Sequence, residues 1–233
     1  MKTNCLNSPT FTRVAPFVAF MGFIAIEQIL RSLLKHQLVS FDVTLLYWLY
    51  IPKAALVGLM LLFFCKSYEE VNFKELAAYR HTALSVVSGL VIFFLWINMD
   101  WTLGGQNTAP GFNPEVFDVE SVKWLVIAIR ITGAVIIVPI MEELFWRSFL
   151  LRYLIKSDFT TVAIGSFSLF SFVAVSILFG LEHHYVFAGI MAGVIFNCIY
   201  YYTKSIAHCI LSHAVANLCL ACYVLTTGYW HFW

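Results

Sequence analysis

Charged side chains are scarce in this chain. Asp, Glu, Lys and Arg make up 12% of the 233 residues, well below the roughly 25% that is typical of soluble globular domains. Hydrophobic residues make up 61%, and apolar runs of membrane-spanning length recur along the sequence. This composition excludes an ordinary soluble domain and favours a polytopic membrane protein. We therefore predict an all-α fold, a transmembrane bundle of seven to eight helices.

Other signatures are missing as well. The net charge is +1 and no basic stripe is present, so we expect no nucleic-acid partner. The six cysteines are scattered, mostly within apolar segments, which is typical of small core residues and not of metal or redox sites. The N-terminus has no short apolar region followed by a small-residue cleavage site, so we expect no removable signal peptide.

The apolar runs divide the chain into predicted membrane spans separated by short connections. Turn residues across positions 100–121 predict a loop there. The later spans are each long enough to cross a hydrocarbon core of about 30 Å. The predicted spans are residues 14–34, 43–65, 82–99, 122–140, 161–181, 186–202 and 206–227.

Lysine and arginine favour alternate connections between these spans. Lys66, Lys74 and Arg80 follow the second span, and Arg152 and Lys156 follow the fourth. Membrane proteins concentrate such residues in cytoplasmic loops. We therefore predict a cytoplasmic N-terminus, seven crossings and a C-terminus on the opposite side.

The stretch 138–147 places charges inside an apolar run. A charged group at bilayer depth costs roughly 2.5–3.5 kcal/mol on insertion scales, so it is rarely there without a partner or a task. In a helix, Glu143 and Arg147 are four residues apart in the favourable order for an ion pair. Glu142 lies about 100° round the helix and cannot easily share that arginine. We predict that Glu143 is neutralised and that Glu142 stays free.

Two features of the first half are also polar. Glu27 and Arg31 are again four residues apart, which predicts an ion pair. Pro52 and Lys53 interrupt the second span, which predicts a kink whose lysine faces protein or water.

Two further polar clusters lie in the C-terminal half. His183 follows the fifth span, and His213 and Asn217 share one face of the last span. A single histidine on an apolar face is usually a structural residue. Here the histidines share an apolar chain with the free Glu142. Activation of water needs a base, groups that orient the water and donors for a developing oxyanion, and these residue types supply all three.

These clusters resemble the motifs of a known family. In this order and on successive apolar spans, they are similar to those of the CPBP family of intramembrane proteases, which includes CAAX prenyl endopeptidases and bacterial Abi-type proteins. The resemblance implies N-terminal transmembrane helices over residues 1–121 and a catalytic core over 122–233. Flanking residues resemble a bacterial subgroup associated with exosortase-type sorting, which implies a bacterial inner membrane. The three motifs are Glu142-Glu143-x-x-x-Arg147, Phe179-x-x-x-His183 and His213-x-x-x-Asn217.

The resemblance implies a role for each charged residue of the first motif. Glu142 would be the general base that activates water for attack on a peptide carbonyl. Glu143 would be held by Arg147, which keeps the helix rigid and the arginine neutralised. For Glu142 to act near neutral pH it should be partly desolvated, and its apolar surroundings are of the right kind.

The resemblance also implies the roles of the other motifs. His183 would orient the water or share its proton, while His213 and Asn217 would stabilise the tetrahedral oxyanion. Ser148 stands where the family commonly has another small residue. Glu182 departs from the small residue usual before the histidine and has no assigned role.

The depth of Glu142 is the main geometric question. Residues 122–155 would make one helix about 51 Å long, more than a single crossing needs. In the simplest seven-crossing arrangement Glu142 lies towards the inner face and His183 towards the outer face. A kink, tilt or partial re-entrance near Pro139 would bring them together, so we predict such a break and an interior water-filled cavity.

The need for a metal stays open from the residues alone. Glu142, His183 and His213 could make a three-ligand zinc site with an open position. The chain has no His-Glu-x-x-His signature, and one glutamate cannot easily be both ligand and base. We favour a glutamate-activated water with no cofactor required.

The resemblance therefore predicts an enzyme, an intramembrane endopeptidase. It would hydrolyse a peptide bond near the C-terminus of a membrane-associated or prenylated protein or peptide. The lipid bilayer is its other expected partner, and the oligomeric state is left open. A proton- or ion-coupled transporter would use the same polar residues along a path, and a non-catalytic scaffold would use them for structure.

Overall fold

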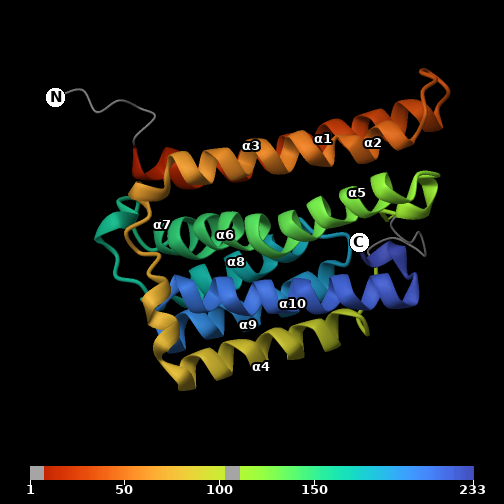
Figure 1. Ribbon diagram of the computed structural model, residues 1–233. Coiled ribbons are helices and arrows are strands. Elements are labelled where there is room, and N and C mark those ends of the chain that lie inside the picture. Colours follow the sequence, from red (N-terminus) through yellow and green to blue (C-terminus); the bar gives the residue numbers. More distant parts are fainter. Residues whose placement is uncertain (1–7, 103–110) are drawn as a thin grey trace.

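The computed structural model describes residues 8–102 and 111–233, so part of the predicted loop at 100–121 lies outside the described residues. All regular elements within those ranges are helical, which confirms the predicted all-α bundle (Figure 1). Six helices are long and apolar enough to cross a membrane, and α8 is a shorter apolar helix. The helices are α1 Pro9–Lys35, α2 Thr44–Trp48, α3 Tyr50–Phe63, α4 Tyr79–Trp96, α5 Glu120–Thr132, α6 Val138–Glu143, α7 Leu151–Tyr153, α8 Leu169–Leu181, α9 Val186–Thr203 and α10 Ile206–Thr227.

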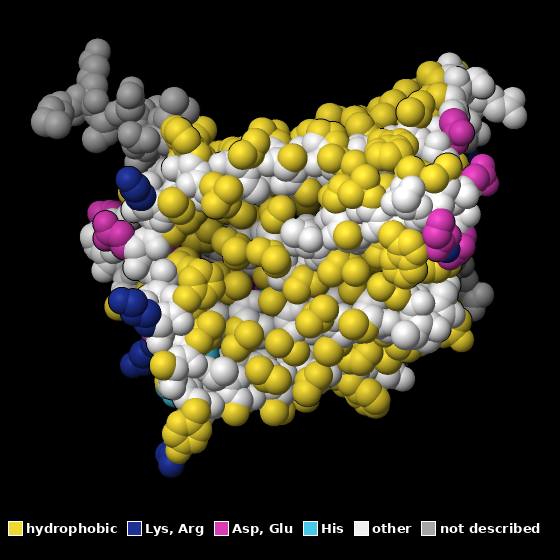
Figure 2. Space-filling view, in the orientation of Figure 1, with side chains coloured by type: hydrophobic (Ala, Val, Ile, Leu, Met, Phe, Trp, Pro, Cys, Tyr) yellow, Lys and Arg dark blue, Asp and Glu magenta, His cyan; other side chains and the backbone are white. Residues whose placement is uncertain are grey.

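The surface of the bundle carries a broad apolar band between two charged ends. Figure 2 shows lysine and arginine gathered at the end where the chain begins, with some acidic side chains among them, and mainly aspartate and glutamate at the other end. Large apolar side chains within the band are mostly exposed: Leu62, Phe63 and Phe94 are 70%, 78% and 62% exposed. Such a contiguous apolar surface is stable only in lipid. The chain is an integral membrane protein.

The helix does not break near Pro139, so the predicted partial re-entrance there is wrong, while a kink or tilt stays a prediction. The chain stays helical from Glu120 to Tyr153, 34 residues in one run, about 51 Å long. Wider π turns at Gly133–Ile137 and Leu144–Leu150 interrupt the α geometry on both sides of α6. Pro139 lies in the first turn of α6, where the i→i−4 bond that it cannot make is already disturbed by the π turn.

The fifth predicted span, 161–181, is too long. The helix α8 begins only at Leu169, because Ser168 has extended backbone and its side chain caps the first turn at Ser171 N. Thirteen residues give a helix of about 20 Å. The turn after α8 therefore does not reach the far end of the bundle, and this is what fixes the depth of His183.

Helices α8 and α9 form a close hairpin. A Cβ atom on Gly189 of α9 would lie 2.8 Å from Gly180 Cα of α8, and one on Gly193 would lie 3.1 Å from Ser176 Cα. A side chain on Gly189 would force the two backbones apart, and one on Gly193 would need its neighbours to yield by a few tenths of an ångström. The hairpin therefore holds the turn that carries Glu182 and His183 in a defined position.

Buried charges tie the N-terminal helix to the end of the long helical run. The Arg13 guanidinium pairs with Glu70 at 2.6 Å and donates to Ser148 Oγ at 3.1 Å. Ser148 also donates to Glu70, and Arg152 donates to Ser148 Oγ at 3.1 Å. Burial alone would raise the pKa of Glu70, but the hydrogen bonds and charge of Arg13, with the Ser148 hydroxyl, outweigh it and hold that pKa below its ordinary value.

The two polar features of the first half behave as predicted. Arg31 Nη2 lies 2.7 Å from Glu27 Oε1, so their ion pair is present. The second span is interrupted at Leu49, between α2 and α3, and Pro52 lies in the first turn of α3. Lys53 is buried and faces protein.

Candidate active site

The Glu143–Arg147 ion pair is present and fully buried. Arg147 Nη1 lies 3.1 Å from Glu143 Oε1, and neither side chain has any exposed area. Arg147 also donates to Asn197 Oδ1 at 3.2 Å and to the Gly193 carbonyl at 3.4 Å, both on α9. The pair therefore fastens the long helical run to the α8–α9 hairpin. Sequence reasoning missed Asn197, although a lone asparagine in an apolar helix was a usable signal.

Glu143 also holds the imidazole of His213. His213 Nδ1 lies 2.9 Å from Glu143 Oε1. Because a carboxylate that is paired with arginine can only accept, Nδ1 carries the hydrogen of this bond. The second ring nitrogen, Nε2, then faces Glu142, 3.9 Å from its Oε2. Glu143 thus sets both the orientation and the tautomer of His213.

Glu142 differs from its neighbour in having no arginine partner: Glu143 Oε1 bonds both Arg147 and His213, while the Glu142 carboxylate makes no hydrogen bond to a described residue. Its side chain is buried, and Oε2 has no donor among the described residues. The carboxylate lines a cavity of about 140 Å³, which has room for water or for a small part of a substrate. The cavity is bounded by Ile92, Phe93, Trp96, Val138, Glu142, Phe179, His183, Ala192, Phe196, His213, Ala216, Asn217 and Leu220.

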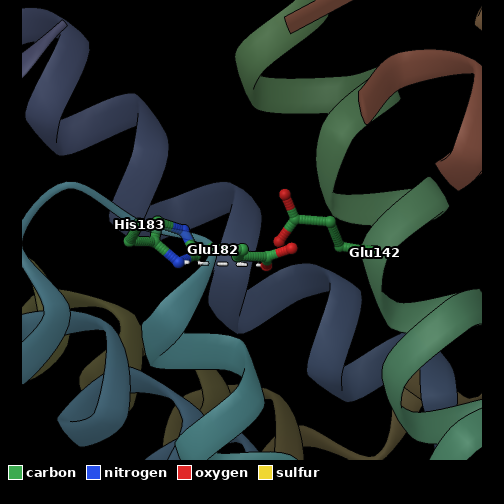
Figure 3. Close-up of side chains that lie close together, drawn as sticks. All are labelled: Glu142, Glu182 and His183. Carbon is green, nitrogen blue, oxygen red and sulfur yellow. Dashed lines mark ion pairs between the residues drawn. The ribbon is translucent and has the colours of Figure 1, made fainter. Parts of the chain in front are cut away.

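The turn after α8 brings His183 to the level of Glu142. The nitrogen and oxygen atoms that Glu142, Glu182 and His183 offer lie within 4.8 Å of one another (Figure 3). His183 Nδ1 lies 2.6 Å from the Phe179 carbonyl and therefore donates to it. This leaves His183 Nε2 as an acceptor. The convergence was predicted, but its cause is the short α8 and not a break at Pro139.

Glu182 belongs to this cluster, although the motifs gave it no role. Its Oε1 accepts a hydrogen bond from Trp146 Nε1 at 3.1 Å and lies 3.8 Å from His183 Nδ1, the pair drawn with a dashed line in Figure 3. Its Oε2 has no partner among the described residues. A second carboxylate close to Glu142 was visible in the sequence only as an unexplained departure from the motif.

Asn217 lines the cavity on the same helix face as His213. Its Nδ2 donates to the Ala134 carbonyl at 2.7 Å. Ala134 lies in the first π turn, where the altered hydrogen-bond pattern makes carbonyls accessible to side chains. One N–H of the amide remains for other partners.

The side chains that converge are not the predicted zinc set. Within the described residues the group whose donor atoms come together is Glu142, Glu182 and His183, whereas His213 uses Nδ1 to bond Glu143. Two carboxylates and one imidazole are a donor set that zinc accepts. That no cofactor is required stays a prediction.

The comparison with known families covers the part of the chain that carries this site. Residues 123–219 match the family model described as type II CAAX prenyl endopeptidase, Rce1-like, and this range contains all seven residues named in the three motifs. No curated protein and no solved structure matches the chain. The fold and the match together define a membrane peptidase. Over residues 123–219 the chain is similar to Rce1-like CAAX proteases, which is consistent with the CPBP family.

Proposed function

We propose that the protein is an intramembrane endopeptidase that hydrolyses its substrate with water activated by Glu142. The substrate is a membrane-associated or prenylated protein or peptide cut near its C-terminus. One observation carries the proposal: the Glu142 carboxylate is buried, lacks a donor at Oε2 and lines a cavity together with His183 and His213.

The chemistry follows from the arrangement of these groups. A water in the cavity gives its proton to Glu142 as its oxygen attacks the peptide carbonyl, and Glu142 then passes the proton to the leaving amine. His183, whose Nε2 is an acceptor, orients the water. His213 in its protonated form donates from Nε2 to the oxyanion, and the remaining N–H of Asn217 is the second donor.

The charge distribution supports an orientation in the membrane. Lysine and arginine gather at the end of the bundle where the chain begins (Figure 2). By the positive-inside rule this end is cytoplasmic. The resemblance to a bacterial subgroup is the support for a bacterial inner membrane.

The test is Glu142→Gln, with Glu69→Gln as the matched control because Glu69 is exposed. A general base contributes about 10²–10⁴ in rate, so Glu142→Gln is expected to lower kcat at least a hundredfold on a tagged membrane substrate. Its melting temperature is expected to hold, because Glu142 Oε2 makes no hydrogen bond that the change would remove. A chelator added to the purified enzyme is expected to leave the rate unchanged.

Other outcomes would point elsewhere. Full turnover by Glu142→Gln would refute the role of Glu142 as base. Loss of folded protein instead of turnover would assign it a structural role, and activity lost to the chelator would assign a metal to the cluster of Glu142, Glu182 and His183.

A further inference from the structure

A second cavity lies on the side of α5 that faces α1 and α3. It has a volume of about 270 Å³ and is distinct in its lining from the cavity at Glu142. Four of its lining residues are charged: Glu27 and Arg31 from α1, Lys53 from α3 and Arg130 from α5. Three cations therefore face one acid inside the membrane-spanning part of the bundle.

Among the described residues, only one of these three cations has a carboxylate partner. Arg31 pairs with Glu27. Lys53 is 6% exposed and makes no hydrogen bond or ion pair with any described residue, although its Nζ lies 4.7 Å from the Phe20 ring centroid. Arg130 Nε likewise has no hydrogen-bond partner among the described residues.

Aromatic rings surround the unpaired cations without neutralising them. The Arg130 guanidinium lies over the rings of Tyr50, Phe112 and Trp233, at 5.0, 4.6 and 5.4 Å from their centroids. Cation–π contacts attract a cation but supply no counter-charge and no acceptor oxygen. Buried cations persist where something pairs with them, so Lys53 and Arg130 indicate an anionic ligand that this cavity binds.

The second cavity is close to the catalytic one. Arg130 and Glu142 lie on the same helical run, twelve residues or about 18 Å apart. Asn217 lines the catalytic cavity and bonds the Ala134 carbonyl, one turn after Arg130. His183 lines the first cavity and its neighbour His184 lines the second.

We propose that this second cavity binds the carboxylate of a peptide substrate, on the C-terminal side of the bond that is cut. An extended peptide rises about 3.3 Å per residue, so about four to six residues link the two cavities. Arg130 offers the planar fork of donors that matches a carboxylate, and Lys53 adds a point charge. This assignment rests on the proposed protease function and makes a free C-terminus part of the recognised substrate.

The kinetic test compares two substrate peptides that differ only in a free or an amidated C-terminus. The full-length enzyme is expected to cleave the free acid with a KM at least tenfold lower and a similar kcat. Lys53→Met and Arg130→Met are expected to raise KM for the acid about tenfold and to leave the amide unchanged. Lys156→Met, which removes an exposed cation at the other end of the bundle, is the matched control and is expected to change neither value. Equal KM values for acid and amide in the unmodified enzyme would overturn the proposal.

A binding test separates this proposal from the catalytic one. The binding test uses the Glu142→Gln variant, which binds substrate without cleaving it if the protease proposal holds. This variant is titrated with a fluorescent free-acid peptide. Unlabelled acid peptide is expected to compete at least tenfold better than its amide, and Lys53→Met in the same background is expected to abolish the difference. Inorganic phosphate and phosphatidylglycerol in mixed micelles are also tested as competitors of the fluorescent peptide. If either one displaces it, and the acid peptide competes no better than its amide, the proposal is overturned and the cavity is assigned as a phosphate site. If Glu142→Gln instead keeps full activity, the proposed role of Glu142 fails. The preference for free-acid over amidated peptide still tests whether the second cavity binds a carboxylate.

Discussion

The buried ion pair of Glu143 and Arg147 allows structure and catalysis to be separated by experiment. Glu143→Gln leaves the shape of the side chain nearly unchanged but removes the counter-charge of Arg147. The buried guanidinium then keeps Asn197 and the Gly193 carbonyl as hydrogen-bond partners among the described residues. Removing one partner of a buried pair costs about 3–5 kcal/mol. For a chain of this size that corresponds to a fall in melting temperature of about 6–20 °C.

Removing both charges should be milder than removing one. In Glu143→Gln combined with Arg147→Met no stranded charge remains, so stability is expected to recover to within about 1–2 kcal/mol of the unmodified protein. Turnover is not expected to recover, because His213 Nδ1 then bonds a neutral amide and the imidazolium form loses its counter-charge. The measurement is a double-mutant cycle of unfolding free energies in detergent, with cleavage rates measured on the same samples.

A matched control lies in the same protein. Glu120 and Lys123 are three residues apart at the start of α5, with side chains 71% and 17% exposed, so Glu120→Gln is expected to cost less than about 1 kcal/mol. If the losses from Glu143→Gln and Arg147→Met simply add in the double variant to within about 0.5 kcal/mol, the two residues are not coupled and the reasoning is refuted.

Two further predictions concern parts of the molecule away from the reacting atoms. The pKa of Glu70 is lowered in the folded protein, so its contribution to stability is present above its ordinary value of 4.5 and is lost as pH falls through the lowered pKa. Melting temperatures measured against pH should show this loss of stability in acid. The Glu70→Gln variant should not show it. Gly189→Ala places a Cβ 2.8 Å from Gly180 Cα, so it is expected to lower stability by about 1–3 kcal/mol and to lower turnover. The control is Gly22→Ala, whose added Cβ meets nothing within 4 Å. It is expected to stabilise the helix by up to about 1 kcal/mol. Equal melting temperatures for the two glycine variants would contradict the close approach of α8 and α9.

The sequence was informative where physics is local. Spans long enough to cross a bilayer, and ion pairs four residues apart, depend on helix geometry alone. Six of the seven predicted spans coincide with helices long enough to cross, and both predicted ion pairs are present. The first turn of α3 also follows from Pro52, because proline is tolerated where no N–H is needed. These features require no knowledge of what packs against them.

The features that sequence reasoning missed depend on neighbours far along the chain. Residues 161–168 are apolar enough to be helical, but a 3-10 turn ends at Thr161 and a turn with Gly165 at positive φ follows, so α8 starts only after the Ser168 cap. Asn197 became visible as a partner only once Arg147 was placed beside it. The role of Glu182 likewise depends on the fold, because Trp146 and Glu142 reach it from another helix.

The π turn at Gly133–Ile137 has a consequence for the direction of the catalytic carboxylate. A π turn holds about one residue more than an α turn, and one residue corresponds to about 100° of rotation about the helix axis. The azimuth at which Glu142 leaves the helix is therefore set by the number of residues between it and Thr132, as well as by their identity. Among related chains, inserting or deleting one residue in this segment would therefore rotate the Glu142 side chain about the helix axis, in addition to changing the length of the helix.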